Sequence, residues 1–72
     1  MANSFGVNLR AARKAKGWSQ QRLAQEAKME SKGYISLLET DKRPVPPGRT
    51  LGALADVLSV SVRDLIGDSA LT

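Results

Sequence analysis

The chain has 72 residues, a length suited to one small domain over residues 1–72, and it contains neither cysteine nor histidine. These absences exclude a disulfide framework and a zinc site built on Cys or His ligands. They also remove the commonest general base and the most reactive nucleophile, so we expect no enzyme activity, no metal and no cofactor.

The sequence shows no sign of a membrane or secreted protein. No apolar run approaches the roughly 18 residues that a membrane helix needs, and the N-terminus has no apolar segment of signal-peptide length. We therefore expect a cytoplasmic protein that makes no membrane contact.

The net charge of +4 is unevenly distributed along the chain. Residues 1–49 contain ten lysines and arginines and four acids, a net charge of +6, whereas residues 50–72 contain one arginine and three aspartates, a net charge of −2. A basic N-terminal part and a mildly acidic C-terminal part are typical of a protein that presents one face to a polyanion. The alternative is a surface on which scattered lysines only aid solubility.

The first helix is expected over residues 4–16, with Ser4 as its N-cap. Phe5 and Leu9 begin an apolar stripe at helical spacing. Gly17 can end the helix, because glycine readily takes a positive φ. The basic residues near the end of this helix also suit its dipole, so they are no independent sign of nucleic-acid binding.

Two short helices follow, over residues 20–27 and from Lys32 to Glu39, separated by a tight polar bend. Each is too short to be stable alone. Two such helices meeting across a turn predict a helix-turn-helix unit, whose second helix can lie in the DNA major groove. Their inward faces carry Leu23, Ala24, Ala27, Ile35 and Leu38.

Trp18 is the only tryptophan and comes directly before Ser19, the expected N-cap of the second helix. An apolar residue in this position can pack back on the helix as a hydrophobic staple. Core packing is therefore favoured over stacking on a nucleic-acid base.

The outward face of the third helix has small or flexible side chains, so it can enter a groove without steric obstruction. Ser31 is its expected N-cap, and Gly33 lowers its helix propensity. In the second helix, Gln20 and Gln21 lie in the first turn beside backbone amides that can bind an anion. The alternative is an ordinary polar surface pair.

Glu39 lies one turn after Ile35 and should be partly buried, so it needs a charged partner. Arg13 lies beside the inward stripe of the first helix, four residues after Leu9. We predict an Arg13–Glu39 ion pair with a structural role.

A proline-containing loop over residues 40–49 leads to a fourth helix at residues 48–58 and a last short helix at residues 62–66. Lys42 and Arg43 in this loop are candidates for phosphate contacts. An apolar set near the end of the chain can either form a homodimer contact or close the helix bundle: Val60, Val62, Leu65 and Ile66. The folded core is expected over about 4–67, followed by a flexible tail at 68–72.

The chain resembles the Cro/phage-repressor-like helix-turn-helix regulators, also called Xre-type regulators. The resemblance rests on FGVNLRAARKAKGWSQQRLAQEA, SKGYISLLE and TLGALADVLSVSVRDLIG, which together cover nearly the whole chain. It implies a compact, all-α, five-helix, lambda-repressor-like domain in which helices two and three form the helix-turn-helix.

The resemblance also implies roles for individual residues. The base-reading positions would be Ser31, Lys32, Gly33 and Ser36. Gln20 would take the position that clamps a phosphate at the start of helix two, and Lys42 and Arg43 would fall in the loop that often touches the DNA backbone. Ser19, Gln21 and Tyr34 are further expected phosphate contacts. The structural ion pair of the family falls on Arg13 and Glu39.

The chain departs from the family pattern in the bend and in the third helix. From Ala24 to Ile35 it is one residue longer than usual, and Lys28 stands where a glycine normally makes the turn. Gly33 replaces a side chain that usually helps to read bases.

The expected function is sequence-specific binding of double-stranded DNA by a transcriptional regulator, a repressor, acting as a homodimer on a palindromic operator. The alternative is a protein-interaction module with a protein partner, such as the antitoxin or accessory regulator of a toxin–antitoxin or phage system.

Overall fold

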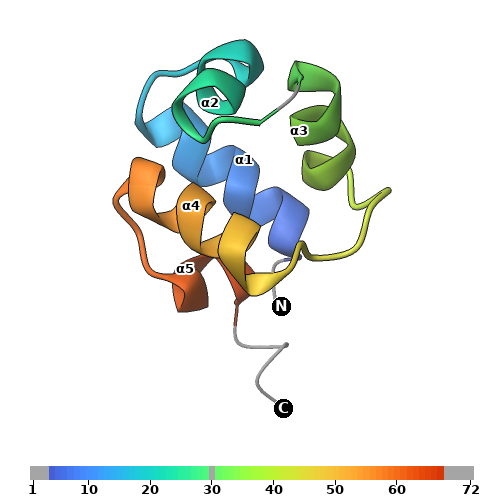
Figure 1. The fold of residues 1–72 in the computed structure, drawn as a ribbon. Helices are drawn as coiled ribbons and strands as arrows, with labels where there is room; N and C mark the ends of the chain where they lie inside the picture. The colour runs from blue at the N-terminus through green and yellow to red at the C-terminus, as the bar shows by residue number, and fades with distance from the viewer. Residues whose placement is uncertain (1–3, 30, 68–72) are drawn as a thin grey trace.

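In the computed structural model, the described part of the chain, residues 4–29 and 31–67, contains five helices and no strand (Figure 1). The helices are α1 Phe5–Ala15, α2 Gln20–Glu26, α3 Lys32–Glu39, α4 Gly48–Leu58 and α5 Val62–Ile66. The predicted all-α fold of five helices is confirmed, and each helix begins and ends at or next to its expected bounds. In these two ranges no helix has the length and apolar character needed to cross a membrane. The tail at 68–72, expected to be flexible, and Glu30 of the bend lie outside the described residues.

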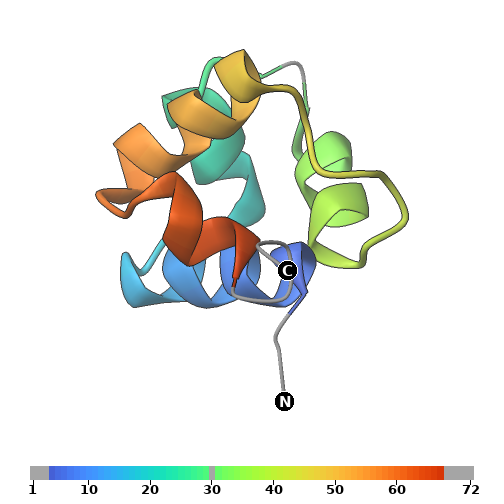
Figure 2. The ribbon, with the colours of Figure 1, turned by 90° about the horizontal axis from the view of Figure 1, so that it is seen from below.

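The helices enclose one core. α1 contacts α3 and α5, while α2 contacts α3 and α4 (Figure 1, Figure 2). The buried apolar side chains are Phe5, Leu9, Leu23, Ala24, Ala27, Ile35, Leu38, Leu51, Leu54, Ala55, Leu58 and Leu65. Helical periodicity identified most of this set, because each helix presents one apolar face to the core.

Serine residues cap three of the helix starts. The Oγ atoms of Ser4, Ser19 and Ser61 each accept a hydrogen bond from a backbone N–H of the following first turn. Ser31 occupies the N-cap position of α3 with an extended backbone, but its side chain makes no capping hydrogen bond. The expected N-cap position of Ser31 is therefore confirmed, without the side-chain hydrogen bond that usually accompanies it.

Helices α1 to α4 all end in the same backbone motif. The first residues with a positive φ after α1, α2, α3 and α4 are Gly17, Lys28, Asp41 and Ser59, respectively. The N–H of each donates to the carbonyl three residues earlier, and the next N–H donates to the carbonyl five residues earlier, which is the Schellman pattern. Three of these four residues are not glycine, so the backbone there is strained by contact between Cβ and the carbonyl oxygen.

The residue that follows each turn anchors three of these ends in the core. Trp18, Met29 and Val60 are partly buried and pack against the core after α1, α2 and α4. The corresponding residue after α3 is Lys42, which is exposed. The end of α3 is therefore held by a different contact.

That contact joins the end of α3 to the start of α1. Asp41 Oδ2 accepts a hydrogen bond from Ser4 Oγ at 2.6 Å, and Asp41 Oδ1 accepts one from the Gly6 N–H at 3.0 Å. Gly6 also allows the two helices to approach closely. A Cβ atom at Gly6 would lie 2.6 Å from the carbonyl oxygens of both Leu38 and Glu39.

The substitution Gly6→Ala should lower the free energy of unfolding by about 2 kcal/mol, because the added methyl group would force α1 and α3 apart. Thermal unfolding followed by circular dichroism measures this effect. Gly52→Ala is the matched control, since nothing lies within 4 Å of a Cβ at that position in α4. The control should be neutral or stabilising by up to about 1 kcal/mol. Equal melting temperatures for Gly6→Ala and the parent would contradict the close helix contact.

The substitution Lys28→Gly should raise the free energy of unfolding by about 1 kcal/mol, because it relieves the strain at φ 57°. For a domain of this size the melting temperature should rise by about 4–8 °C. Lys28→Ala is the control, since it removes the charge but keeps the Cβ atom. A similar increase in both variants would show that the charge, and not the backbone strain, is responsible.

Candidate nucleic-acid interface

The structure contains the ion pair expected between Arg13 and Glu39. Arg13 Nε lies 2.6 Å from Glu39 Oε2, and Arg13 Nη2 donates to Glu39 Oε1 at 3.1 Å. The two residues are 9% and 7% exposed. A bidentate geometry of this kind is among the strongest arrangements of two charged side chains, and it fixes the orientation of α1 relative to α3.

Two further groups complete this ion pair. Arg13 Nη1 donates to the backbone oxygen of Trp18 at 2.7 Å, and Gln20 Nε2 donates to Glu39 Oε1 at 3.2 Å. The pair therefore connects α1 and α3 to the first turn of α2. The sequence predicted the charged partners but not the part played by Gln20, which was assigned only to phosphate binding.

The first turn of α3 faces solvent, as the predicted DNA-reading role requires. Ser31, Lys32 and Gly33 are exposed, and Ser36 one turn later is half-buried. The opposite side of α3 carries Ile35, which has no exposed surface. The four residues assigned to base reading are thus separated from the core-facing side of the helix.

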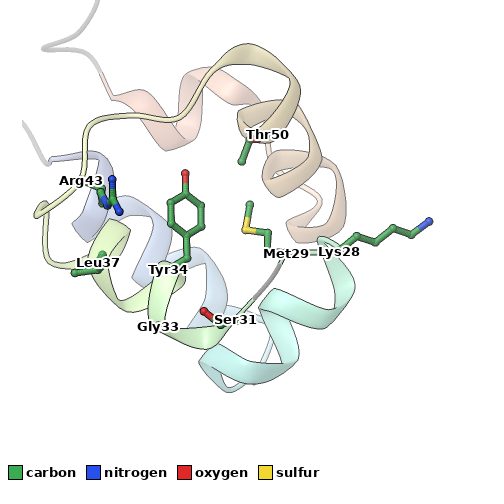
Figure 3. Close-up of a pocket in the computed structure, with 8 residues that line it drawn as sticks. All are labelled: Lys28, Met29, Ser31, Gly33, Tyr34, Leu37, Arg43 and Thr50. Carbon is green, nitrogen blue, oxygen red and sulfur yellow. The ribbon is translucent and has the colours of Figure 1, made fainter.

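A wide groove of about 830 Å³ lies between α3 and the start of α4 (Figure 3). The ring of Tyr34, a predicted phosphate contact, extends from α3 into this groove between Met29 and Arg43. Leu37 and Thr50 also line the groove, and the sequence prediction did not include them. Leu37 lies one turn after Gly33, a spacing that places both on the same side of a helix.

A smaller hollow of about 300 Å³ lies where α2 meets the start of α3. Gln21 and Gln25 line it from α2, and Ser31 and Lys32 line it from the N-cap and the first residue of α3. Gln21 was a predicted phosphate contact, whereas Gln25 was not predicted. Since it follows Gln21 by one turn, helical spacing was a signal that could have identified it.

The groove and the hollow together form a basic surface. Among the described residues that line them none is acidic, and three are cationic: Lys28, Lys32 and Arg43. Lys42, next to Arg43 in the loop, is exposed. A polyanion is therefore the partner that this surface attracts.

The apolar set predicted as a dimer contact is divided between core and surface. Leu65 is 1% exposed and belongs to the core, which fits the alternative that it closes the helix bundle. The cause is the packing of α5 on α1, where Asn8 Nδ2 donates to the Leu65 carbonyl at 3.0 Å. Val60 and Ile66 are half-buried against the core, and Val62 is 38% exposed.

Trp18 packs at the edge of the core, as expected. Lys16 Nζ and the Arg22 guanidinium carbon each lie 5.3 Å from the centroid of its ring. A cation over the ring competes for a face that a stacked base would need. The described residues also contain no cluster of three acidic side chains that could hold a metal ion.

The chain is similar to known regulators in both sequence and structure. The family model described as a helix-turn-helix domain matches residues 4–66. The P22 c2 repressor, solved in complex with synthetic operator 9T, is 30% identical with a TM-score of 0.82 over 89% of this chain and 94% of that chain. SinR of Bacillus subtilis, a master regulator for biofilm formation solved in complex with DNA, is 34% identical with a TM-score of 0.79 over 85% and 95%.

Two further solved structures are also similar to the chain. C.AhdI, a restriction-modification controller protein from Aeromonas hydrophila, is 34% identical with a TM-score of 0.78 over 86% of this chain and 91% of that chain. SinR has also been solved in complex with the protein SinI, where the chain covers 58% of the matched chain. A comparison with curated protein sequences found no match to this chain.

The substitution Glu39→Ala should lower the free energy of unfolding by about 3 kcal/mol, because it leaves the Arg13 guanidinium buried without its anion. Chemical denaturation followed by circular dichroism measures the loss. The matched control is Glu26→Ala, which removes an exposed ion pair between Glu26 and Arg22. The Arg22 side chain is 53% exposed and the Glu26 side chain is 41% exposed. The control should cost less than about 1 kcal/mol. Similar losses in the two variants would show that the buried Arg13–Glu39 pair contributes no more to the free energy of unfolding than an exposed ion pair.

Proposed function

Because the chain belongs to the helix-turn-helix domain family, among the Cro- and phage-repressor-like (Xre-type) regulators, we propose that it regulates transcription by binding specific sites on double-stranded DNA. The observation that carries this function is the exposed first turn of α3 beside a basic groove whose described lining contains no acidic residue. A helix of this kind fits the major groove, which is wide enough to admit it. The P22 c2 repressor and SinR structures with DNA support the proposal.

Base reading falls to the N-cap and the first two turns of α3. Lys32 can donate to guanine O6 and N7, and the hydroxyl groups of Ser31 and Ser36 can donate or accept at base edges. Gly33 has no side chain, so it contributes close approach of the backbone instead of a hydrogen bond. Direct readout would therefore depend mainly on Lys32.

Phosphate binding falls to three places around that turn. Ser19, Gln20 and Gln21 lie at the start of α2, where backbone N–H groups favour an anion. The Gln20 amide uses one N–H for Glu39, and its second N–H is available for a phosphate oxygen. Further contacts would come from the Tyr34 hydroxyl and from the loop residues Lys42 and Arg43.

We propose that the protein is a cytoplasmic repressor that occupies a palindromic operator as a homodimer, without cofactor or catalysis. Half-sites would lie about one helical turn apart. Of the four apolar residues predicted for the dimer contact, Val62 and the edges of Val60 and Ile66 remain at the surface.

A protein partner is the second candidate function. It is favoured by the similarity to SinR, which has been solved in complex with SinI. The exposed Val62 offers such a partner an apolar contact. Co-purification of the chain with one stoichiometric protein, together with loss of DNA binding, would favour this candidate.

The test of the proposed function begins with selection of bound sequences from random DNA. Enrichment of one motif would support a specific regulator, and a symmetric motif would support the dimer. A folded chain that enriches no motif would contradict specific readout.

On the selected site, Lys32→Ala should weaken binding about tenfold, because one specific base contact is worth about 1–3 kcal/mol. Binding to a scrambled site should change little. Fluorescence anisotropy at two salt concentrations measures both affinities. Lys42→Ala is the comparison, since a phosphate contact should weaken binding equally on both sequences and reduce the salt dependence. Equal losses on both sequences for Lys32→Ala would instead assign Lys32 to phosphate.

A further inference from the structure

We propose that Asp41 is a positioning residue for DNA binding, which ties the loop carrying Lys42 and Arg43 to the start of α1 and so directs both cations towards phosphate. This inference rests on the proposed function, because it concerns the phosphate contacts of that loop. Asp41 itself carries a negative charge, so it would not be a phosphate ligand.

The first support is the unusual end of α3. After α1, α2 and α4, an apolar side chain packs against the core and holds the exit of the helix. After α3 the equivalent residue is Lys42, which is exposed. A cation in this position is free to meet a ligand, but it cannot anchor the chain in an apolar core.

The Asp41 carboxylate supplies the missing anchor. It accepts hydrogen bonds from Ser4 Oγ at 2.6 Å and from the Gly6 N–H at 3.0 Å. Ser4 Oγ in turn accepts from the Val7 N–H at 3.2 Å, so the contact joins Asp41 to the first turn of α1. A carboxylate at a helix start is also favoured by the helix dipole.

The backbone around Asp41 is fixed at the same time. Asp41 has φ 59°, its N–H donates to the Leu38 carbonyl at 3.2 Å, and the Lys42 N–H donates to the Leu37 carbonyl at 2.9 Å. Further along the loop, Pro46 is buried.

Lys42 and Arg43 therefore lie on a short segment that is held at both ends. Arg43 lines the groove beside α3 (Figure 3). Loss of the Asp41 side-chain contact would leave the first end of this segment held only by the two backbone hydrogen bonds of Asp41 and Lys42. Lys42 and Arg43 would then be less well ordered before DNA binds, and ordering them would reduce the affinity.

The simple electrostatic effect of removing Asp41 has the opposite sign. Replacing an anion near a phosphate-binding surface by a neutral residue should strengthen binding, because it removes a like-charge repulsion. The positioning role predicts weaker binding. The direction of the change therefore distinguishes the two effects.

The experiment compares Asp41→Asn with the parent on the selected DNA site. Asparagine keeps the size of the side chain and tolerates positive φ. We expect affinity to fall about tenfold, as for loss of one charge-assisted contact, and the salt dependence to decrease. Asp56→Asn is the matched control, since Asp56 is an exposed aspartate of α4, and it should leave affinity unchanged or slightly higher. All measurements are made at a temperature at which circular dichroism shows each variant to be folded.

A double-mutant cycle separates positioning from a general structural effect. In a chain that already carries Lys42→Ala and Arg43→Ala, Asp41→Asn should no longer weaken binding. An equal loss in both backgrounds would overturn the positioning role, as would unchanged or tighter binding by Asp41→Asn alone.

A readout without DNA completes the test. Cleavage by a lysine-specific protease after Lys42, located by mass spectrometry, should be faster in Asp41→Asn than in the parent or in Asp56→Asn. An unchanged rate would overturn the anchoring of the loop. Absence of DNA binding by the parent would overturn the proposed function and the positioning role together, whereas binding by the parent with unaltered affinity in Asp41→Asn would overturn the positioning role alone.

Discussion

The arrangement of the helices depends on one buried ion pair. Arg13 and Glu39 are both buried, and the loss of hydration costs free energy that their mutual attraction offsets only if the remaining hydrogen-bonding groups are satisfied. Here they are, through the Trp18 carbonyl and the Gln20 amide. The contribution of such a pair is specificity more than net stability, because apolar side chains could fill the same space. The pair fixes one register of α3 relative to α1 and the start of α2, and these elements carry the candidate DNA surface.

Much of this arrangement was predictable from residue spacing. The apolar stripes gave the inward faces, and Glu39 one turn after Ile35 required a partner, for which Arg13 was suitably placed. The contacts of Asp41 were not predictable, because they join residues 35 and 37 positions apart in the sequence and depend on a positive φ at Asp41. Periodicity also did not reveal that Leu65 is fully buried, since that depends on how the short helix α5 packs against α1.

Glycine was an incomplete guide to the helix ends. The sequence marks one of the four left-handed turns with glycine, at Gly17, while Lys28, Asp41 and Ser59 adopt the same conformation. Each of the three tolerates backbone strain because the following segment is held by another contact: core packing after Lys28 and Ser59, and the contact with α1 at Asp41 itself. Tertiary contacts therefore override the local preference for glycine at residues with a positive φ.

The candidate site shows why these distant anchors matter for recognition. With Gly33 in its first turn, α3 offers few side chains for direct readout, and Lys32 is the strongest donor among them. A surface with so few base contacts must place them accurately, and accurate placement is the part that phosphate contacts supply. The candidate phosphate-binding groups are in turn held by interactions with other helices: the Arg13–Glu39 pair contacts the start of α2 through Gln20, and the Asp41 carboxylate contacts the start of α1. Specificity in this chain would thus depend on residues that never touch a base.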